Sequence, residues 1–370
     1  MSSLRQGTPA FLLLTVLVAA CGSSVATPGA TATAFGSETP SPVVVYSPSP
    51  SPSASPVGSP TPEGPTPMPS GWDYSDLDGV AAPSGLAHRL PVAVMIDDNV
   101  TARPQSGMST ASIVIQAMAD GGEDRYMVIW QEGSASDIGP ARSTRPYFVY
   151  WATEYKPLLG HIGGDAVSLQ QTIPQLSNHI YNEDGIDRSC PWHRITTRPS
   201  PHNDYTNTAV LLACAAAQGY PATYQGLPRR TFVDPSPLSG LPSSQNITIP
   251  YRTGTIGYRF DPTTGKYKRV VDGKLQIDPA NGQQVYATDV VVMFQTYAMQ
   301  PSLDHLRPVV GSIGSGTAIV FEEGRAVAAT WKKSSQTDLT RFFDKSGHEI
   351  PLVRGEIFIQ SVVPTTKVTY

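Results

Sequence analysis

The segment Pro91–Asp97, PVAVMID, decides the fold class of this chain. Its first six residues form a continuous apolar run, which is typical of a strand that is buried on both faces of a sheet. Two further candidate strands follow at Ser112–Met118 and Tyr126–Trp130, and the turn-forming pair Gly121-Gly122 separates them. The sequence therefore predicts a layer of buried strands in this region.

Segments with helical spacing alternate with these strands. The predicted helices cover Arg145–Tyr155, Asp165–Thr172 and Thr208–Gln218, and Leu158–Ile162 is a further buried strand. Because strands that alternate with helices form sheets covered by helices, we expect an N-terminal α/β domain over residues 88–225.

After residue 225 the pattern changes to short segments that are rich in β-branched and aromatic residues, divided by turns such as Asp272-Gly273. The predicted strands are Thr255–Phe260, Tyr267–Val271, Val285–Tyr286, Val290–Tyr297, Val309–Ile313, Ala318–Phe321, Ala326–Lys332 and Glu356–Val363. We therefore expect a mostly antiparallel, β-rich C-terminal domain over residues 251–364, joined to the first domain by the Pro- and Ser-rich stretch 226–250. The expected fold class of the whole chain is α+β.

The chain is weakly acidic. It contains 26 Lys and Arg residues against 30 Asp and Glu residues, which gives a formal net charge of −4. A nucleic-acid-binding protein needs a basic surface that offsets the phosphate charge. We therefore expect no nucleic-acid partner.

The N-terminus carries an export signal. The ten-residue run Phe11–Ala20, FLLLTVLVAA, is too short to span a bilayer, so residues 1–20 are predicted to be a signal peptide. Cys21 follows directly, as in a bacterial lipobox, where the cysteine receives acyl chains such as palmitate and becomes the new N-terminus. The alternative is ordinary cleavage after Ala19 or Ala20 beside an incidental cysteine. Lipidation would anchor the protein on the extracytoplasmic face of the cell membrane.

Residues 21–71 are predicted to be a disordered tether. Ser-Pro repeats such as Ser47–Pro52 fix the backbone φ angle and remove hydrogen-bond donors, which favours an extended, solvated chain. Low charge and low hydrophobicity leave this segment nothing to bury. Such a tether would hold the folded part away from the membrane.

Cys190 and Cys214 are the remaining cysteines. In an oxidising compartment they could pair and close a loop of about 25 residues. The alternative is two unrelated thiols, with Cys214 buried in the predicted helix 208–218. No Cys/His spacing typical of structural zinc is present, and we expect neither a metal nor another cofactor.

Four arginines lie at loop-like positions among Pro and Gly residues, where binding groups are often mounted on a rigid scaffold. They are Arg103, Arg125, Arg142 and Arg145. The guanidinium group offers a planar set of donors that suits carboxylate or phosphate, so the set predicts an anion-binding cleft. The alternative is that each arginine pairs with the chain's own acids, such as Asp97, Asp98 or Asp165.

Arg142 and Arg145 are three residues apart near the start of the predicted helix 145–155. On a helical first turn their Cβ atoms would lie on one face, about 5–6 Å apart. The helix N-terminus would add its partial positive charge to an anion site there. We therefore expect these two arginines to act as a pair.

Two histidines extend the candidate site. His161 lies where a strand enters a glycine pair, and His202 lies beside Asn203 in a turn-rich segment. Together with Asp97 or Asp204 they could hold a metal ion, but no HExxH-like spacing is present, and hydrogen-bonded structural roles are the alternative. The sequence also lacks GxSxG and other nucleophile motifs, so it assigns no catalytic residues.

Several motifs occur in the same order as in a known family. They are Pro91–Asp97, Ala102–Gly107, Gly121-Gly122 with Arg125, Ile138–Tyr147, His161–Gly164, Pro201–Asn203, Gly314–Gly316, Trp331–Lys333 and Ile357–Val363. Together they resemble the YerB-like bacterial lipoproteins, a domain of unknown function with N- and C-terminal parts. The resemblance implies a two-domain envelope lipoprotein and supplies no established activity. Gln116 and Ser112 stand where the family resemblance leads us to expect acids.

We therefore expect a membrane-anchored lipoprotein that binds an anionic cell-wall polymer or envelope protein through an Arg-rich cleft of its N-terminal domain. A second hypothesis is a loose similarity to the LytR-CpsA-Psr phosphotransferases, carried by the order of Asp97, Arg142 and a glycine pair. That similarity implies transfer of lipid-linked glycopolymers, although Ser143 and Ser112 stand where it requires acids.

Overall fold

The computed structural model describes residues 68–370 except 188, 227–228 and 302–305. The predicted signal peptide, Cys21 and the tether up to residue 67 lie outside the described residues. All the described residues belong to one compact unit of the chain, Glu63–Tyr370. None of the helices in this described part is long and apolar enough to cross a membrane.

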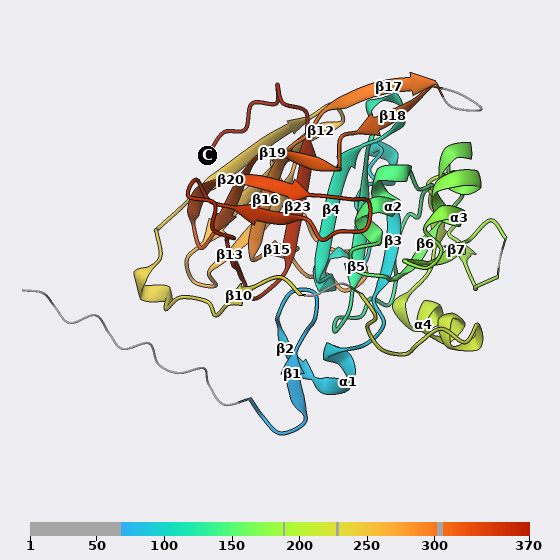
Figure 1. Cartoon of the computed structure of the whole chain (residues 1–370), viewed down its shortest axis with the longest axis horizontal. Helices are drawn as coiled ribbons and strands as arrows, with labels where there is room; N and C mark the ends of the chain where they lie inside the picture. The colour runs from blue at the N-terminus through green and yellow to red at the C-terminus, as the bar shows by residue number, and fades with distance from the viewer. Residues whose placement is uncertain (1–67, 188, 227–228, 302–305) are drawn as a thin grey trace, which may run out of the picture. The chain divides into compact units, whose positions relative to one another are not determined.

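A ten-stranded sheet runs through the described part (Figure 1). Its N-terminal strands are β3 (Val92–Asp97), β4 (Ile113–Met118), β5 (Asp124–Trp130), β6 (Leu158–His161) and β7 (Tyr181–Asp184). Its C-terminal strands are β16 (Asp289–Phe294), β19 (Gly314–Glu322), β20 (Arg325–Lys333), β21 (Arg341–Phe343) and β23 (Ile357–Val362). The strand order is β21-β20-β19-β16-β23-β4-β5-β3-β6-β7.

The two predicted domains share this sheet. β23 comes late in the chain, yet it pairs in parallel with both β16 and β4, with Ile357 opposite Ile113 of β4. β4 and β5 form an antiparallel hairpin, and β3 pairs antiparallel with β5 and parallel with β6. The N-terminal part is therefore a mixed sheet that continues without a break into the C-terminal strands.

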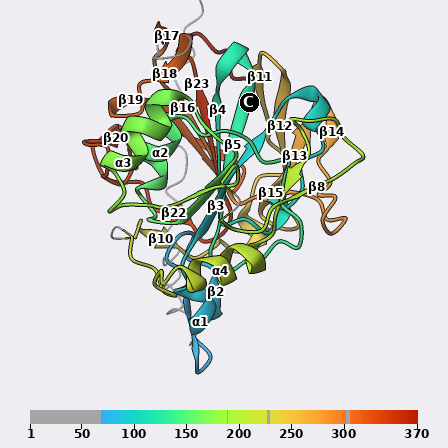
Figure 2. The ribbon, with the colours of Figure 1, turned by 90° about the vertical axis from the view of Figure 1, so that its right-hand side faces the viewer.

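A smaller antiparallel sheet and helix α4 (Thr208–Ala217) pack on one face of the large sheet, and helices α2 (Pro146–Ala152) and α3 (Ile173–Gln175) pack on the other (Figure 2). The small sheet contains β11 (Asn246–Tyr251), β12 (Gly254–Asp261), β13 (Lys266–Val271), β14 (Lys274–Leu275) and β15 (Tyr286–Ala287). The α-helices are α1 (Ser84–Ala87), α2 (Pro146–Ala152), α3 (Ile173–Gln175) and α4 (Thr208–Ala217). The described part is mostly β, with every described α-helix in the N-terminal half.

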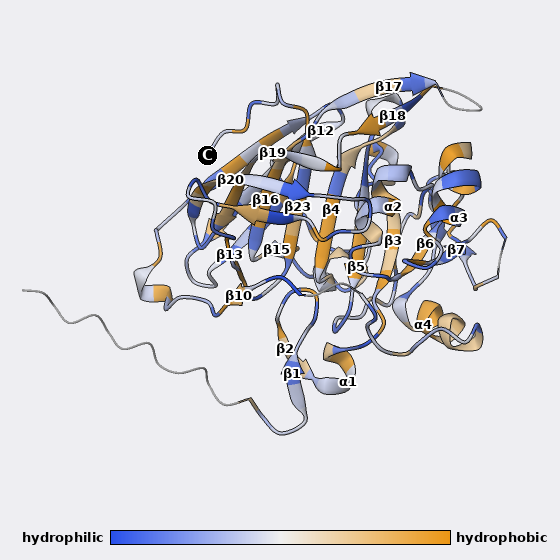
Figure 3. Ribbon diagram, in the orientation of Figure 1, coloured by the Kyte–Doolittle hydropathy of each residue, from blue (hydrophilic) through white to orange (hydrophobic). Residues whose placement is uncertain are grey.

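Side-chain alternation in the central strands explains these layers. Val94 and Val128 pack in one apolar cluster with Ile256 of the small sheet. Their chain neighbours Ala93 and Met127 pack in the other cluster, which contains the aromatic residues of α2. Because successive side chains of a strand point to opposite faces, a strand covered on both sides must be apolar throughout. The central strands show this continuous apolar character (Figure 3).

Three small antiparallel ladders and one parallel pair complete the structure. The antiparallel ladders pair β1 (Trp72–Tyr74) with β2 (Ala81–Pro83), β8 (His193–Arg194) with β9 (Asp204–Tyr205), and β17 (Tyr297–Pro301) with β18 (Leu306–Val310). β10 (Phe232–Val233) pairs in parallel with β22 (Leu352–Val353). A disulfide joins Cys190 to Cys214 of α4, with the Cα atoms 5.6 Å apart.

Several local predictions were wrong. The stretch 226–250 is more than a join, because it contains β10 and most of β11, in which the buried residues Ile247 and Ile249 alternate with exposed ones. The predicted strand Val290–Tyr297 is divided, since β16 ends at Phe294 and β17 begins at Tyr297. By contrast, the predicted helix 165–172 is confirmed as a helical segment over 166–175, although its middle part, Ser168–Thr172, is π-helical and leads into α3.

Candidate functional site

The site forms where β3 and β6 separate. The two strands pair only as far as Val94 and Gly160, and beyond this point the extended segment 140–144 lies between them. The Arg142 amide donates to the Met95 carbonyl at 2.9 Å, and the Ile162 amide donates to the Arg142 carbonyl at 3.0 Å. These backbone bonds fix Arg142 beside the end of β3.

Asp97, the last residue of β3, organises the side chains there. Its carboxylate is fully buried, and Oδ2 accepts a hydrogen bond from His202 Nδ1 at 2.6 Å. The same oxygen lies 3.1 Å from Arg142 Nε, and Oδ1 accepts a bond from the Asn99 amide at 3.0 Å. A buried carboxylate that is paired with the Arg142 guanidinium and hydrogen-bonded by His202 is an electrostatic anchor, because leaving it unpaired would be costly.

Arg142 and His202 also reach the surface. Their side chains are 26% and 14% exposed. The two Nη atoms of Arg142 have no hydrogen-bond or ion-pair partner among the described residues. The same holds for the Nε2 atom of His202. Asp97 therefore orients both side chains. The Nη donors of Arg142 remain available to solvent or to a ligand, and Nε2 of His202 is a further donor when the ring is in its imidazolium form.

Arg125, the strand partner of Asp97 on β5, lies buried beside this group. Its Nη1 donates to the Ser143 carbonyl at 2.8 Å and to Ser143 Oγ at 3.2 Å, whereas its Nε has no hydrogen-bond partner. Burial lowers the pKa of Arg125, and the nearby Arg142 guanidinium acts in the same direction. Within the described residues no carboxylate lies within ion-pair distance of Arg125, so it adds a positive charge without a direct counter-ion.

Arg145 does not form a pair with Arg142, and this prediction was wrong. Helix α2 begins only at Pro146, and Arg145 has extended backbone angles, φ −139° and ψ 156°. The two arginines therefore share no helical face. Arg145 forms ion pairs with Asp120 and, at 3.7 Å, with Asp165.

His161 and Asn203 have local structural contacts. His161 is fully buried, and its Nδ1 and Nε2 lie 2.8 Å from the Gly163 carbonyl and 2.9 Å from Asn182 Oδ1. Asn203 Nδ2 donates to the Ile195 carbonyl at 3.1 Å. Of the predicted site residues, the structure thus brings Asp97, Arg142 and His202 into direct contact and places Arg125 beside them.

Arg103 belongs to a second cluster, centred on Asp98. Its Nε lies 2.8 Å from Asp98 Oδ1, and its Nη1 lies 3.0 Å from Asp272 Oδ2. Three further donors reach the buried Asp98 carboxylate, namely Gln105 Nε2, Gln116 Nε2 and the Tyr126 hydroxyl. Arg103 and Arg145 therefore follow the alternative in which each arginine pairs with the chain's own acids. Arg142 follows it through Nε only, because its Nη atoms have no such partner among the described residues.

Sequence reasoning missed Arg269, which joins this second cluster to the small sheet. Arg269 of β13 is fully buried, and its Nη2 donates to Gln116 Oε1 at 3.0 Å and to the Tyr126 hydroxyl at 3.1 Å. Burial alone would lower the pKa of Arg269, but the neighbouring phenol groups of Tyr126 and Tyr258 raise it overall. No local signal marks it, because an arginine in an alternating strand normally points to solvent.

One group in the described part has the composition of a metal site. It consists of Glu183, Cys190 and Cys214, whose ligand atoms lie within 4.8 Å of one another. The two sulfur atoms are bonded to each other, so in this oxidised form neither offers the thiolate that binds a metal.

Known proteins share this architecture. Residues 77–221 match the N-terminal domain, and residues 247–359 the C-terminal domain, of the family described as protein of unknown function DUF3048. The "Putative lipoprotein YerB" of Bacillus subtilis (strain 168) is 27% identical over 292 residues, which cover 78% of this chain and 85% of that protein. A crystal structure of the YerB protein from Bacillus subtilis superposes with a TM-score of 0.70 at 24% identity, over 80% of this chain and 99% of that one. The chain therefore belongs to the DUF3048 family, whose N- and C-terminal domains it carries in order.

Proposed function

We propose that this protein is a lipid-anchored extracytoplasmic binding protein that holds an anionic group of a cell-envelope ligand between Arg142 and His202. The lipobox-like signal at Cys21 and the name of the Bacillus subtilis relative support the anchor. The proposed ligand is a phosphorylated or carboxylated polymer, or an envelope protein that displays such groups.

The observation that carries this proposal is the arrangement around Asp97. One buried carboxylate orients the side chains of Arg142 and His202, and both side chains keep outward-facing capacity for hydrogen bonds. The unpaired charge of Arg125 behind them makes the local field more positive. Charge-assisted bonds from pre-oriented donors are the strong ones, because little side-chain freedom is lost on binding.

The phosphotransferase hypothesis receives no support from these contacts. Such an enzyme requires carboxylates that are free to hold magnesium. In this site both oxygens of Asp97 are already occupied, by His202 and Arg142 on one side and by the Asn99 amide on the other.

The test is a comparison of three soluble envelope fragments by calorimetry. They are a glycerol phosphate oligomer, a muropeptide with a free carboxylate, and neutral chitotriose. We expect at least one anionic fragment to bind and chitotriose not to bind. His202→Gln should weaken the anionic interaction, whereas Arg325→Lys, on a side chain that is 53% exposed and lies in the β20 region, should not. Equal binding of chitotriose, or an identical loss in both variants, would contradict the proposal.

A further inference from the structure

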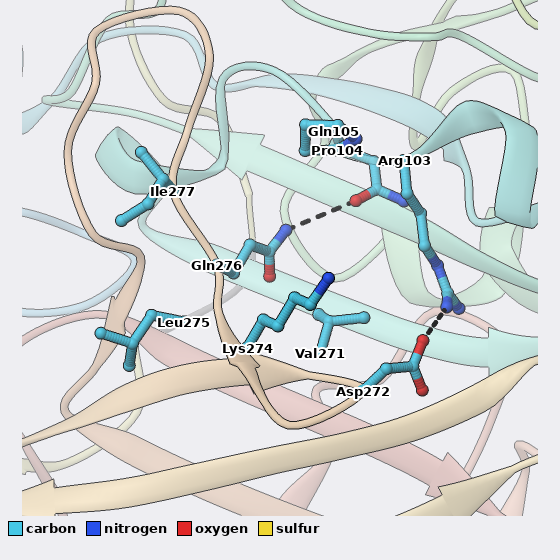
Figure 4. A pocket seen from close by; sticks show the side chains of 9 residues that line it. All are labelled: Arg103, Pro104, Gln105, Val271, Asp272, Lys274, Leu275, Gln276 and Ile277. Carbon is cyan, nitrogen blue, oxygen red and sulfur yellow. Dashed lines mark hydrogen bonds and ion pairs between the residues drawn. The ribbon is translucent and has the colours of Figure 1, made fainter.

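A pocket lies between the loop 103–105 and the hairpin of β13 and β14 (Figure 4). Its volume is about 430 Å³. Small-molecule sites typically have volumes of about 300–1,000 Å³, so this pocket can hold a small ligand. It lies on the Asp98 side of β3 and is separate from the Arg142 and His202 site.

The floor of the pocket is held in place by buried amides. Gln105 and Gln276 are both almost fully buried, and Gln276 Nε2 donates to Gln105 Oε1 at 3.4 Å. Gln105 also donates to Asp98, and Gln276 accepts a hydrogen bond from Arg269. A floor whose polar groups are already paired does not need to rearrange when a ligand binds.

The hairpin turn is fixed at the pocket mouth. Asp272 has φ +49° and Gly273 has φ +79°, as the two central residues of a tight hairpin turn require. Asp272 Oδ1 accepts the Thr255 amide at 2.7 Å, and Oδ2 binds Arg103. The turn therefore presents the next residues, Lys274 and Leu275, in a defined orientation.

The walls are largely apolar. Pro104 and Val271 line the pocket together with Leu275 and Ile277. Leu275 and Ile277 are 46% and 44% exposed, and Figure 4 shows their side chains at the rim of the pocket, on the other side of the strand from Lys274 and Gln276. Covering these apolar side chains with the apolar part of a ligand would be favourable, at about 25 cal/mol per Å² of apolar surface removed from water.

The charge that remains at the pocket is positive. Arg103 is held by Asp98 and Asp272, whereas the exposed Lys274 has no hydrogen-bond or ion-pair partner among the described residues. Figure 4 shows the Lys274 side chain directed toward the space between Gln276 and Arg103. Asp98 and Asp272 both pair with Arg103, so Lys274 is the one cation of the lining that remains without a counter-ion among the described residues.

From this combination we infer that the pocket binds a small amphipathic anion. The apolar body of the ligand lies against Pro104 and Val271 and extends over the rim residues Leu275 and Ile277, and its carboxylate or phosphate pairs with the Lys274 ammonium group. This inference goes beyond the proposed function, because it concerns another site and another class of ligand, and either can fail without the other.

The test uses four probes whose apolar chains have similar length and whose head groups differ in charge. They are octanoate, octyl phosphate, octyl glucoside and octyltrimethylammonium. The full chain carrying Cys21→Ser, which removes the predicted lipidation site, allows measurements without detergent. Carbon-labelled methyl groups of Leu275 and Ile277 provide the signal in NMR titrations. We expect octanoate or octyl phosphate to shift these methyl resonances and to bind at least about fivefold more tightly than octyltrimethylammonium.

Two sets of variants separate the roles of charge and apolar surface. Lys274→Gln should weaken binding of the anionic probe about fivefold, and the double variant Leu275→Ser, Ile277→Ser about tenfold. The matched control Lys345→Gln changes an exposed lysine elsewhere and should have no effect. Comparison of octanoate with octyl phosphate identifies which anionic group is preferred. Preference for the cationic probe, absence of methyl shifts with all four probes, or an equal effect of Lys345→Gln would overturn the inference.

Discussion

Asp97 and Asp98 are consecutive residues, but their carboxylates serve opposite faces of the ten-stranded sheet. Because side chains alternate along β3, Asp97 points to the same face as Met95, the face that α2 covers, and it contacts Arg142 and His202 there. Asp98 contacts Arg103 and the hydroxyl of Tyr126 on the face that the small sheet covers. The end of β3 therefore anchors both the proposed anion site and the pocket beside Arg103.

Asp97→Asn should destabilise the protein. The substitution removes the negative charge that compensates the Arg142 guanidinium and accepts the hydrogen bond from His202, and breaking a buried ion pair costs about 3 kcal/mol. Urea unfolding at pH 7 measures the change in the free energy of unfolding. The control Asp338→Asn, at an exposed position, should stay within about 0.5 kcal/mol of the parent. A loss no larger than that of the control would show that Asp97 is not an anchor.

Asp124→Asn should stabilise the protein at high pH. Burial raises the pKa of Asp124 from 3.8 to about 7, although a hydrogen bond from Thr253 acts in the opposite direction. The folded state therefore binds a proton that the unfolded state releases, and the parent loses stability as the pH rises from about 4 through 7. An uncharged asparagine avoids this loss, so the variant should gain up to about 4 kcal/mol over the parent above pH 7.

The measurement for Asp124→Asn is the difference in the free energy of unfolding between variant and parent at pH 5 and at pH 8. We expect the difference to grow with pH in favour of the variant. A difference that is the same at both pH values would mean that the Asp124 carboxylate stays charged in the folded protein.

Reduction of the disulfide should lower stability. The bond between Cys190 and Cys214 closes a loop of about 25 residues, which corresponds to about 3 kcal/mol from restriction of the unfolded chain. Thermal melting with and without dithiothreitol measures the effect. The double variant Cys190→Ala, Cys214→Ala should melt at a lower temperature and be insensitive to the reductant. Equal melting of the oxidised and reduced parent protein would contradict this prediction.

Cys21→Ser should release the protein from the membrane. The variant cannot be acylated at the predicted position, and the apolar run before it is too short to span a bilayer. Fractionation of cells and labelling with an alkyne-bearing palmitate measure the outcome. A variant that stays as membrane-bound as the parent would show that another segment holds the protein.

The sequence predicts the central strands better than their arrangement. β3, β4, β5 and β6 lie close to their predicted positions, because a strand buried on both faces leaves a continuous apolar run. The position of β23 between β16 and β4 has no such signal, since pairing between distant segments depends on the whole fold. β11 was missed for another reason: nearby Pro and Ser residues obscured the alternation of Ile247 and Ile249.

The candidate site shows the same limits. The sequence proposes Asp97, Arg142 and His202 as site residues, but it gives no reason to join these three and separate Arg103 from them. That separation follows from the opposite directions of the Asp97 and Asp98 side chains. The residues next to Arg269 in the sequence do not indicate that it is buried, because its burial depends on packing between the two sheets.

The most direct test of the proposed anion site is the affinity of the full chain for inorganic phosphate in the parent and in Arg142→Lys, measured together with the melting temperature. Lysine keeps the charge but loses the planar fork that can contact Asp97 and a ligand at once. The account predicts binding that is weaker by about 1–3 kcal/mol, with nearly unchanged melting. A melting temperature that falls by many degrees, with no phosphate affinity detectable in the parent, would show that Arg142 is only structural and would contradict the account.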